Sequence, residues 1–336
     1  MSRTAIIGAG AWGTALAITL ARKGTHSIRL WAHEKDLVES MAKNRVNEHF
    51  LPGFELPASI QATDNLEAAL EGAEIVVSVM PSQHCRSLFE RMAPAFHPDT
   101  LVVSCTKGIE NATLLRMTEV IADVAHKHNW TPRIGALSGP SFAKEVARGD
   151  PTAVTIASCD SELARAVQHA FNSSRFRVYT NDDVIGVELG GALKNIIAIA
   201  AGVCDGLELG HNSVAALITR GLAEIARLVA ACGGRLDTMA GLAGLGDLVL
   251  TCTGDLSRNR SVGVELGKGR KLPDIIAGMH GAVAEGVFTT KAAVGLARKK
   301  NVERPITEQM FAILEQGKAP QTAIEELMTR AARSEV

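Results

Sequence analysis

Thr4-Ala5-Ile6-Ile7-Gly8-Ala9-Gly10-Ala11-Trp12-Gly13-Thr14 joins a short apolar run to a helix-like stretch through three glycines spaced Gly-x-Gly-x-x-Gly. In this pattern Gly8 permits a tight turn, Gly10 lets the backbone approach a pyrophosphate, and Gly13 lets the helix pack closely on the sheet. The start of the helix then offers free N–H groups and a partial positive charge to phosphates. A purely structural turn is the alternative, but the flanking strand and helix favour a dinucleotide site.

The residue after the second strand of such a unit distinguishes NAD from NADP. An acidic residue there holds the ribose 2′-OH, whereas a basic residue accommodates a 2′-phosphate. This chain has His33 in that place, followed by Glu34 and Lys35. His33 and Lys35 favour tolerance of the 2′-phosphate, and a solvated loop histidine fits equally well. The predicted cofactor is therefore NAD or NADP.

The first half of the chain alternates apolar runs with helix-like stretches, as expected for a parallel sheet with crossover helices. The runs are rich in Val and Ile, which is typical of strands buried on both faces. The expected strands are Thr4–Ile7, Ser27–Trp31, Ile75–Val79, Leu101–Cys105, Ile134–Leu137, Ala153–Ala157 and Arg175–Tyr179. We expect helices at Thr14–Arg22 and Leu114–Lys127, and a loop over residues 46–59.

From about Asp182 long Ala- and Leu-rich stretches with helical spacing dominate. The expected helices are Val187–Val203, Ser213–Ala231, Thr289–Lys299 and Pro305–Glu315, and one strand candidate remains at Leu248–Leu250. We therefore predict a Rossmann-type α/β domain over residues 1–181 and an all-helical domain over residues 182–336.

The composition excludes several classes of protein. The 336 residues include 35 Lys and Arg against 36 Asp and Glu, so the charge indicates neither nucleic acid nor an anionic membrane as a partner. The sequence predicts no signal peptide and no transmembrane span. Six scattered cysteines without a Cys-x-x-Cys pair indicate reduced thiols rather than disulfides or zinc ligands. We expect a cytoplasmic protein without a metal.

Two lysines are candidates for acid–base chemistry. Lys107 follows the strand Leu101–Cys105 at its carboxyl end, where open α/β sheets place ligands. Lys194 lies inside the apolar helix Val187–Val203, from which it either reaches solvent or points into a site. A lysine held among apolar groups has a lowered pKa, which suits a general base near neutral pH.

Two further stretches draw attention. Ser257-Arg258-Asn259-Arg260 gathers donors that can surround a phosphate, although spacing alone slightly favours a helix start capped by Ser257 with solvated arginines. Gly241–Gly246 leads to Asp247, and these glycines serve either close helix packing or the approach of that carboxylate to a ligand.

Six blocks occur in one order along the chain: Gly8–Ala17, Thr106–Glu110, Ser138–Glu145, Lys194-Asn195, Gly244–Asp247 and Ser257–Arg260. Together they resemble the bacterial NAD(P)-dependent glycerol-3-phosphate dehydrogenases, nearly from end to end and at that family's spacings. The resemblance implies a 6-phosphogluconate-dehydrogenase-like fold and hydride transfer between dihydroxyacetone phosphate and sn-glycerol 3-phosphate. It also implies that reduction supplies glycerol 3-phosphate for phospholipid synthesis.

The resemblance further implies the roles of individual residues. Lys194 would exchange a proton with the C2 oxygen, Lys107 would contact substrate and cofactor, and Asp247 would orient Lys194 and bind a substrate hydroxyl. The other implied substrate ligands are Gly139, Ser141, Ser257, Arg258 and Asn259. The implied cofactor ligands are Gly8, Gly10, Ala11, Trp12, Gly13, His33, Lys107, Ala143, Arg258, Val283 and Glu285. Position 11 is more often serine in the family, so Ala11 would contribute only its backbone N–H.

Two other functions stay open at this point. A β-hydroxyacid dehydrogenase of the 6-phosphogluconate type shares the two-part fold and a helical lysine beside asparagine, but the blocks at residues 106–108 and 257–260 argue against it. A non-catalytic regulator that senses a dinucleotide would need no lysine base. The long apolar helices of the second half favour a homodimer.

Overall fold

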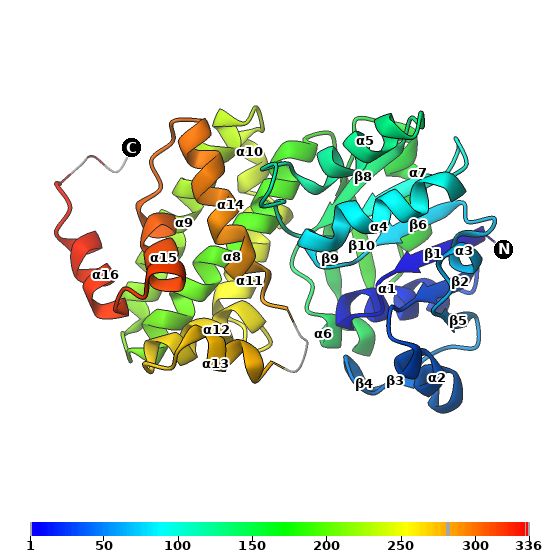
Figure 1. Ribbon diagram of the computed structural model, residues 1–336, viewed down its shortest axis with the longest axis horizontal. Helices are drawn as coiled ribbons and strands as arrows, with labels where there is room; N and C mark the ends of the chain where they lie inside the picture. The colour runs from blue at the N-terminus through cyan, green and yellow to red at the C-terminus, as the bar shows by residue number, and fades with distance from the viewer. Residues whose placement is uncertain (1, 280–282, 333, 335–336) are drawn as a thin grey trace.

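The computed structural model describes residues 2–279, 283–332 and 334. Figure 1 shows two regions side by side. Residues 2–181 form a sheet flanked by helices, called the sheet region below, and the chain from residue 184 onward is helical and is called the helical region. This architecture confirms the predicted fold class, a Rossmann-type α/β part followed by an all-α part.

The main sheet follows the apolar runs of the sequence. Its strands are β1 Ser2–Ile7, β2 His26–Trp31, β5 Ile60–Thr63, β6 Ile75–Ser78, β7 Leu101–Ser104, β8 Arg133–Ser138, β9 Thr152–Ala157 and β10 Phe176–Asn181. The spatial order β10-β9-β8-β7-β6-β1-β2-β5 contains the doubly wound order of dinucleotide-binding sheets, with the switch point between β1 and β6. The carboxyl ends of β1, β2, β6, β7 and β8 share one edge, called the carboxyl edge below.

The sheet is not wholly parallel, which corrects the expectation from the sequence. β8 and β9 pair antiparallel, with Ser138 opposite Thr155, whereas β9 and β10 are parallel to each other. Apolar runs buried on both faces look alike in either direction, so their composition does not reveal the reversal. Because of this reversal, β10 ends at the edge opposite the carboxyl edge, and the following helix starts there.

The prediction of a loop over residues 46–59 is wrong in part. These residues contain a small antiparallel hairpin, β3 Val46–Asn47 and β4 Leu51–Glu55. Proline and glycine within β4 argue against a strand in the interior of a sheet, but a two-stranded hairpin tolerates them. The fully buried Asn47 donates hydrogen bonds to the Ala9 carbonyl (2.7 Å) and the Thr14 hydroxyl (2.9 Å), so this hairpin is fastened to the glycine turn.

Helices cover both faces of the sheet (Figure 1). They are α1 Ala11–Arg22, α2 Lys35–Asn44, α3 Leu66–Leu70, α4 Cys85–Met92, α5 Met117–Lys127, α6 Ala143–Arg148 and α7 Ser161–Phe171. The helix expected from Leu114 begins three residues later, at Met117. Leu114 has a φ of 62°, and Ile109 pairs with Arg116, so the preceding residues form a closed loop instead of a helical turn.

The helical region is built around one long central helix, α8. The helices are α8 Val184–Gly206, α9 His211–Ala231, α10 Leu236–Met239, α11 Asp247–Thr253, α12 Arg258–Gly267, α13 Leu272–Ala277, α14 Glu285–Lys299, α15 Pro305–Gln316 and α16 Pro320–Met328. The strand candidate Leu248–Leu250 is wrong, because these residues lie inside α11. A π-helical turn, Leu242–Gly246, leads into that helix.

Helix α8 connects the two regions. It is long and apolar enough to cross a membrane, but 89% of its apolar window is buried inside the protein. A Cβ on Gly191 would lie 2.4 Å from the Ser138 hydroxyl, so α8 passes the carboxyl end of β8 three residues before Lys194. The helix therefore delivers Lys194 to the carboxyl edge of the sheet.

Helices α8 and α12 cross at very short range. A Cβ on Gly202 would lie 2.0 Å from the Arg260 carbonyl oxygen, and one on Gly263 would lie 1.9 Å from the Ile199 carbonyl oxygen. Only glycine permits this approach of two backbones. The crossing places the first turn of α12 beside Asn195, the neighbour of Lys194.

Candidate functional site

The glycine turn has the shape that a dinucleotide needs. Gly8 has a φ of 121°, and a Cβ there would lie 2.2 Å from the Val79 carbonyl oxygen. A Cβ on Gly13 would lie 1.9 Å from the Gly8 carbonyl oxygen, whereas a Cβ on Gly10 would meet nothing within 4 Å. The turn is therefore open at Gly10, the N-cap of α1, and the first turn of α1 carries no acidic side chain. These residues fit a pyrophosphate at the N-terminus of α1.

The other predicted cofactor ligands come from several elements. Ala11 and Trp12 open α1, and the buried indole Nε1 of Trp12 has no hydrogen-bond partner among the described residues. His33 is exposed just after β2. Ala143 opens α6, which packs on α1, and Val283 lies just before α14.

Glu285 lies at the start of α14 and contacts the sheet region. Its carboxylate accepts hydrogen bonds from the Ser82 backbone N–H (2.9 Å) and hydroxyl (2.6 Å). A Cβ on Gly108 would lie 2.4 Å from the Ser82 Cβ, so the segment carrying Lys107 lies against the same contact. Burial raises the pKa of Glu285. Ser82 was not foreseen, because its partner is 203 residues away in the sequence.

The charged centre of the site consists of Lys107, Lys194 and Asp247. The Lys107 ammonium lies 2.6 Å from Asp247 Oδ2, and the Lys194 ammonium lies 2.7 Å from Oδ1 of the same carboxylate. The side chains of Lys194 and Asp247 are 7% and 1% exposed, and that of Lys107 is 17% exposed. Lys194 therefore points into this charged centre and does not reach solvent.

Thr251 completes this centre, although the sequence analysis missed it. Its hydroxyl accepts a hydrogen bond from the Lys194 ammonium (2.6 Å) and donates one to the Asp247 carbonyl oxygen (2.6 Å). Its position four residues after Asp247 places both side chains on one face of a helix. That spacing was the available signal, but it was hidden by the interpretation of residues 248–250 as a strand.

Burial and charge act in opposite directions on this centre. Burial, helped by the charge of the nearby Lys107, outweighs the attraction of Asp247 and lowers the pKa of Lys194 to about 8. Burial opposes the ionisation of Asp247, but Lys107 and Lys194 outweigh it and hold its pKa below the usual range. Asp247 is thus ionised near neutral pH, while Lys194 is poised to gain or lose a proton.

Gly139 and Ser141 follow β8 at the carboxyl edge. The Lys107 ammonium donates to the Gly139 carbonyl oxygen (3.2 Å), and the Ser141 hydroxyl donates to the same oxygen (2.9 Å). With one hydrogen bond to Asp247 and one to Gly139, Lys107 keeps one of its three donors without a partner among the described residues. Lys194 likewise keeps one donor beyond Asp247 and Thr251.

The start of α12 carries donors that could bind an anion. The Ser257 hydroxyl accepts from the Arg260 backbone N–H (3.2 Å), so the capping interpretation is correct for Ser257. The first turn of α12 has no acidic side chain, and the Arg258 residue is exposed. Asn259 donates to Asn195 (2.9 Å) and accepts from the Gly286 N–H (2.9 Å), which leaves its second amide hydrogen without a partner among the described residues.

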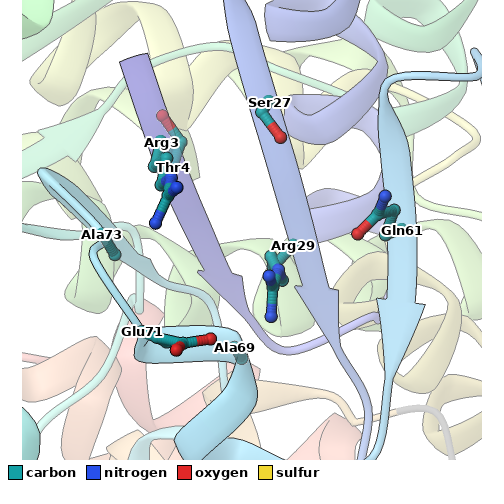
Figure 2. A pocket seen from close by; sticks show the side chains of 8 residues that line it. All are labelled: Arg3, Thr4, Ser27, Arg29, Gln61, Ala69, Glu71 and Ala73. Carbon is teal, nitrogen blue, oxygen red and sulfur yellow. The ribbon is translucent and has the colours of Figure 1, made fainter. Parts of the chain in front are cut away.

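Other features lie away from this centre. A pocket of about 180 Å³, lined by Arg3, Arg29 and Glu71 among others, lies toward the amino ends of β1 and β2 and holds none of the predicted ligands (Figure 2). Burial raises the pKa of the Cys105 and Cys252 thiols to about 12, so these cysteines are not nucleophiles near neutral pH. Among the described residues, no three His, Cys, Asp or Glu side chains gather as metal ligands.

Comparison with known families covers almost the whole chain. Residues 3–164 match the model of the NAD-dependent glycerol-3-phosphate dehydrogenase N-terminus. Residues 183–325 match the model of the NAD-dependent glycerol-3-phosphate dehydrogenase C-terminus.

Individual relatives agree with this match. A glycerol-3-phosphate dehydrogenase [NAD(P)+] of Koribacter versatilis is 67% identical over 100% of this chain and 99% of its own length. That of Acidobacterium capsulatum is 56% identical over the full length of both chains. The crystal structure of glycerol-3-phosphate dehydrogenase from Coxiella burnetii, 44% identical, superimposes with a TM-score of 0.93 over 98% of this chain and 99% of that one.

Replacement of Asp247 by alanine is expected to destabilise the protein by about 3–5 kcal/mol at pH 7, because it leaves buried ammonium groups without a counter-charge. The loss should shrink at high pH, where Lys194 becomes neutral. Urea unfolding of the variant across this pH range measures both effects. Asp255→Ala is the matched control: the Asp255 side chain is 94% exposed and pairs only at the surface with Arg260, so its loss should cost less than about 1 kcal/mol. Equal losses for the two variants would contradict the prediction.

Proposed function

This chain belongs to the NAD-dependent glycerol-3-phosphate dehydrogenase family, and we propose that it reduces dihydroxyacetone phosphate to sn-glycerol 3-phosphate with Lys194 as the proton donor. The observation that carries the proposal is the buried pair Lys194–Asp247, with Lys107 on the second carboxylate oxygen. Family membership removes the two alternatives, a 6-phosphogluconate-type dehydrogenase and a non-catalytic regulator.

The phosphate of the substrate is bound at the start of α12. There the helix N-terminus, Ser257, Arg258 and the free amide hydrogen of Asn259 supply donors to an anion. Asn259 is fixed through Asn195, which adjoins Lys194, so the phosphate seat and the proton donor are held at a constant separation. Gly139 and Ser141 border the substrate from the carboxyl edge.

The proton is handled by Lys194. The hydride to C2 of the substrate would come from NADH or NADPH bound at the glycine turn. The Lys194 ammonium gives its proton to the C2 oxygen, which completes the alcohol and leaves a neutral amine. The Lys107 ammonium steadies the negative charge that develops on that oxygen, and Asp247 keeps both ammonium groups oriented. In the oxidising direction the neutral amine takes the same proton back.

The cofactor is held at the glycine turn by Gly8, Gly10, Ala11, Trp12 and Gly13. We propose that His33, Lys107, Ala143, Arg258, Val283 and Glu285 complete its site. Both NADH and NADPH are accepted in this proposal, because His33 stands where an acidic residue would hold the ribose 2′-OH and the exposed Lys35 offsets the charge of the exposed Glu34.

The wider setting is also proposed. The enzyme works in the cytoplasm without stable membrane association and supplies glycerol 3-phosphate for phospholipid synthesis. It consists of two domains, residues 1–181 and 182–336, in line with the end of β10 at Asn181 and the start of α8 at Val184.

Lys194→Ala is expected to lower turnover about 10²- to 10⁴-fold while leaving cofactor affinity unchanged, since it removes the proton donor. In the wild type, reduction needs the ammonium, so its rate should fall as the pH rises through about 8, and oxidation should fall as the pH drops through the same value. Absorbance of NADH and NADPH with dihydroxyacetone phosphate measures turnover. Lys144→Ala, at an exposed position, is the control and should keep the turnover of the wild type. Near-normal turnover of Lys194→Ala would contradict the role of Lys194 as the proton donor.

Arg258→Gln is expected to raise the KM for dihydroxyacetone phosphate about 10- to 100-fold, the effect of one charge-assisted hydrogen bond. Activity with phosphate-free dihydroxyacetone should be equally poor in variant and wild type. Arg260→Gln is the matched control in the same helical turn, because Arg260 is already paired with Asp205 and Asp255. An unchanged KM for Arg258→Gln would remove Arg258 from the phosphate site.

A homodimer is proposed as the working form. The apolar face of α8 is used inside the chain, so the support comes from α9, where Ala215 and Ala216 are exposed and Leu217 and Ile218 are half-buried. Light scattering should give twice the chain mass of 35.5 kDa. A single species of monomer mass would refute the dimer.

A further inference from the structure

The segment that carries Lys107 is a closed loop. Ile109, two residues after Lys107, forms a β-bridge with Arg116. The Glu110 N–H donates to the Leu115 carbonyl oxygen (3.0 Å), and the Leu114 N–H donates to the Glu110 carbonyl oxygen (2.9 Å). Displacement of Arg116 therefore displaces Ile109, and Lys107 with it.

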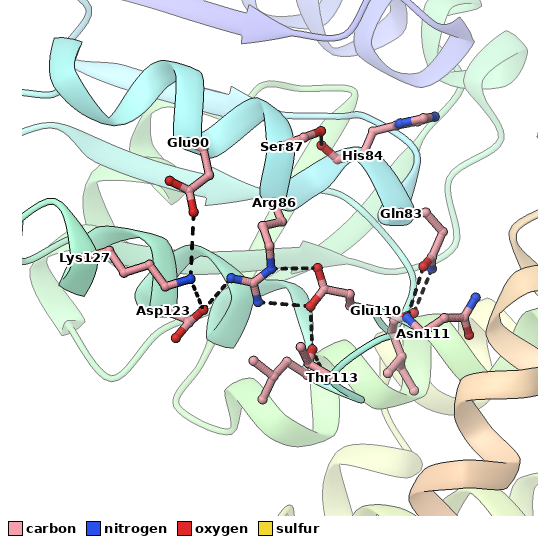
Figure 3. Close-up of polar contacts among 12 residues, drawn as sticks. Gln83, His84, Arg86, Ser87, Glu90, Glu110, Asn111, Thr113, Asp123 and Lys127 are labelled. Atoms are coloured by element: carbon pink, nitrogen blue, oxygen red, sulfur yellow. Dashed lines mark hydrogen bonds and ion pairs between the residues drawn. The ribbon is translucent and has the colours of Figure 1, made fainter.

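On the side of the sheet region, the loop is hydrogen-bonded to α4 and to the turn at residues 82–84 that precedes it. Arg86 binds both oxygens of Glu110 (2.9 and 3.0 Å), as Figure 3 shows. Gln83 donates to the Ile109 carbonyl oxygen (2.9 Å) and accepts from the Asn111 N–H (3.0 Å). Burial opposes the ionisation of Glu110, but Arg86 and Thr113 outweigh it and lower its pKa, so this anchor is charged.

On the side of the helical region, the loop is held by Glu188 of α8. The carboxylate of this residue, 5% exposed, lies 2.5 Å from the Arg116 guanidinium. It also accepts hydrogen bonds from the Thr118 N–H (2.9 Å) and hydroxyl (2.5 Å). Ile109 is fully buried in the same core as Leu189 and Leu193 of α8.

Glu188 thus lies on the same helix as Lys194, six residues before it, and fastens the loop that carries Lys107. The two lysines meet on opposite oxygens of Asp247, at 2.6 and 2.7 Å. A geometry this tight requires the loop and the helix to be held in a fixed relation, because a shift of about 1 Å can cost 10²-fold in rate. The hydrogen bonds of Glu188 supply that relation.

We propose that Glu188 is a positioning residue, which sets Lys107 against Lys194 by fastening Arg116 and Thr118 to α8. It touches neither lysine and acts through the loop. The inference rests on the proposed function of the two lysines. Arg86 and Glu110 form the opposite anchor, so the loop is held from both regions at once.

The test compares Glu188→Gln with Glu119→Gln. Glu119 pairs with the same Arg116 guanidinium (2.9 Å) and accepts from the Arg116 backbone N–H (2.9 Å), a hydrogen bond that a glutamine oxygen also accepts, but its side chain is 43% exposed. Reduction of dihydroxyacetone phosphate by the wild type is measured first, because its absence would contradict the proposed function and not the positioning role. Glu188→Gln should then lower kcat about 10- to 100-fold with unchanged cofactor affinity, and Glu119→Gln should stay near the wild type.

A second readout separates positioning from stability. Lys194 is faced by Asp247, Lys107 and Cys252, and the charge of Lys107 lowers the pKa of Lys194, whereas the Cys252 thiol stays neutral. If Lys107 moves away, the acid limb of glycerol 3-phosphate oxidation should shift to higher pH, by up to about one unit. Wild-type kcat with an unshifted limb in Glu188→Gln, or an equal fall in Glu119→Gln, would overturn the proposal.

Thr118→Val decides the matter if Glu188→Gln does not fold. It removes the hydrogen bond that the Thr118 hydroxyl donates to Glu188 and the weaker one that it accepts from Arg116 (3.3 Å), and it keeps the ion pair between Glu188 and Arg116. A smaller fall in kcat with an upward shift of the same limb supports the role of Glu188. A variant with the rate and pH profile of the wild type would overturn it.

Discussion

One buried carboxylate shared by two ammonium groups is the constraint on which the rest of the structure depends. Asp247 would be costly inside the protein without a partner, and so would Lys194. Each is tolerable because the other is 2.7 Å away and because Lys107 adds a second positive charge at 2.6 Å. The three residues come from three places, the loop after β7, the middle of α8 and the start of α11. The two regions must therefore be folded and packed together before the centre exists.

The topology explains how α8 reaches this centre. The reversal between β8 and β9 leaves the chain at the far edge of the sheet after β10, so α8 must run back along β8 to continue. On that path it passes Ser138 at Gly191 and presents Lys194 one turn later. The same helix then crosses α12 at glycines, which places Asn259 and the start of α12 beside Asn195. Helix α8 alone thus positions both the proposed proton donor and the proposed phosphate site.

The sequence predicted what is encoded locally. Gly8 to Gly13, the apolar strands, Lys107, Lys194 and the long helices carry their signals within a few residues. The reversal of β9 left no such signal, because strands buried on both faces read alike in either direction. Residues 248–250 are apolar in every position, so they show no helical or strand period, and the structure places them in a helix in which the Thr251 hydroxyl donates to the Asp247 carbonyl oxygen one turn earlier. Ser82 and Asn47 were not predicted, because the Glu285 carboxylate that binds Ser82 is 203 residues away and the two groups to which Asn47 donates are at least 33 residues away. Ser257 caps α12, and this capping is compatible with its proposed place among the phosphate donors.

Helix α8 is one uninterrupted helix that has Asp183 as its N-cap and carries Glu188, Lys194 and Asn195. Each residue of an α-helix advances the side chains by about 100°. One residue gained or lost between Glu188 and Lys194 would turn the amine to another side of the helix, away from Asp247, even with every contact of Glu188 intact. Substitutions between these two residues are tolerated wherever packing allows, but insertions and deletions are not. The spacing of six residues between Glu188 and Lys194 therefore sets the angle between their side chains around the helix axis, and a change of one residue in this spacing cannot be absorbed.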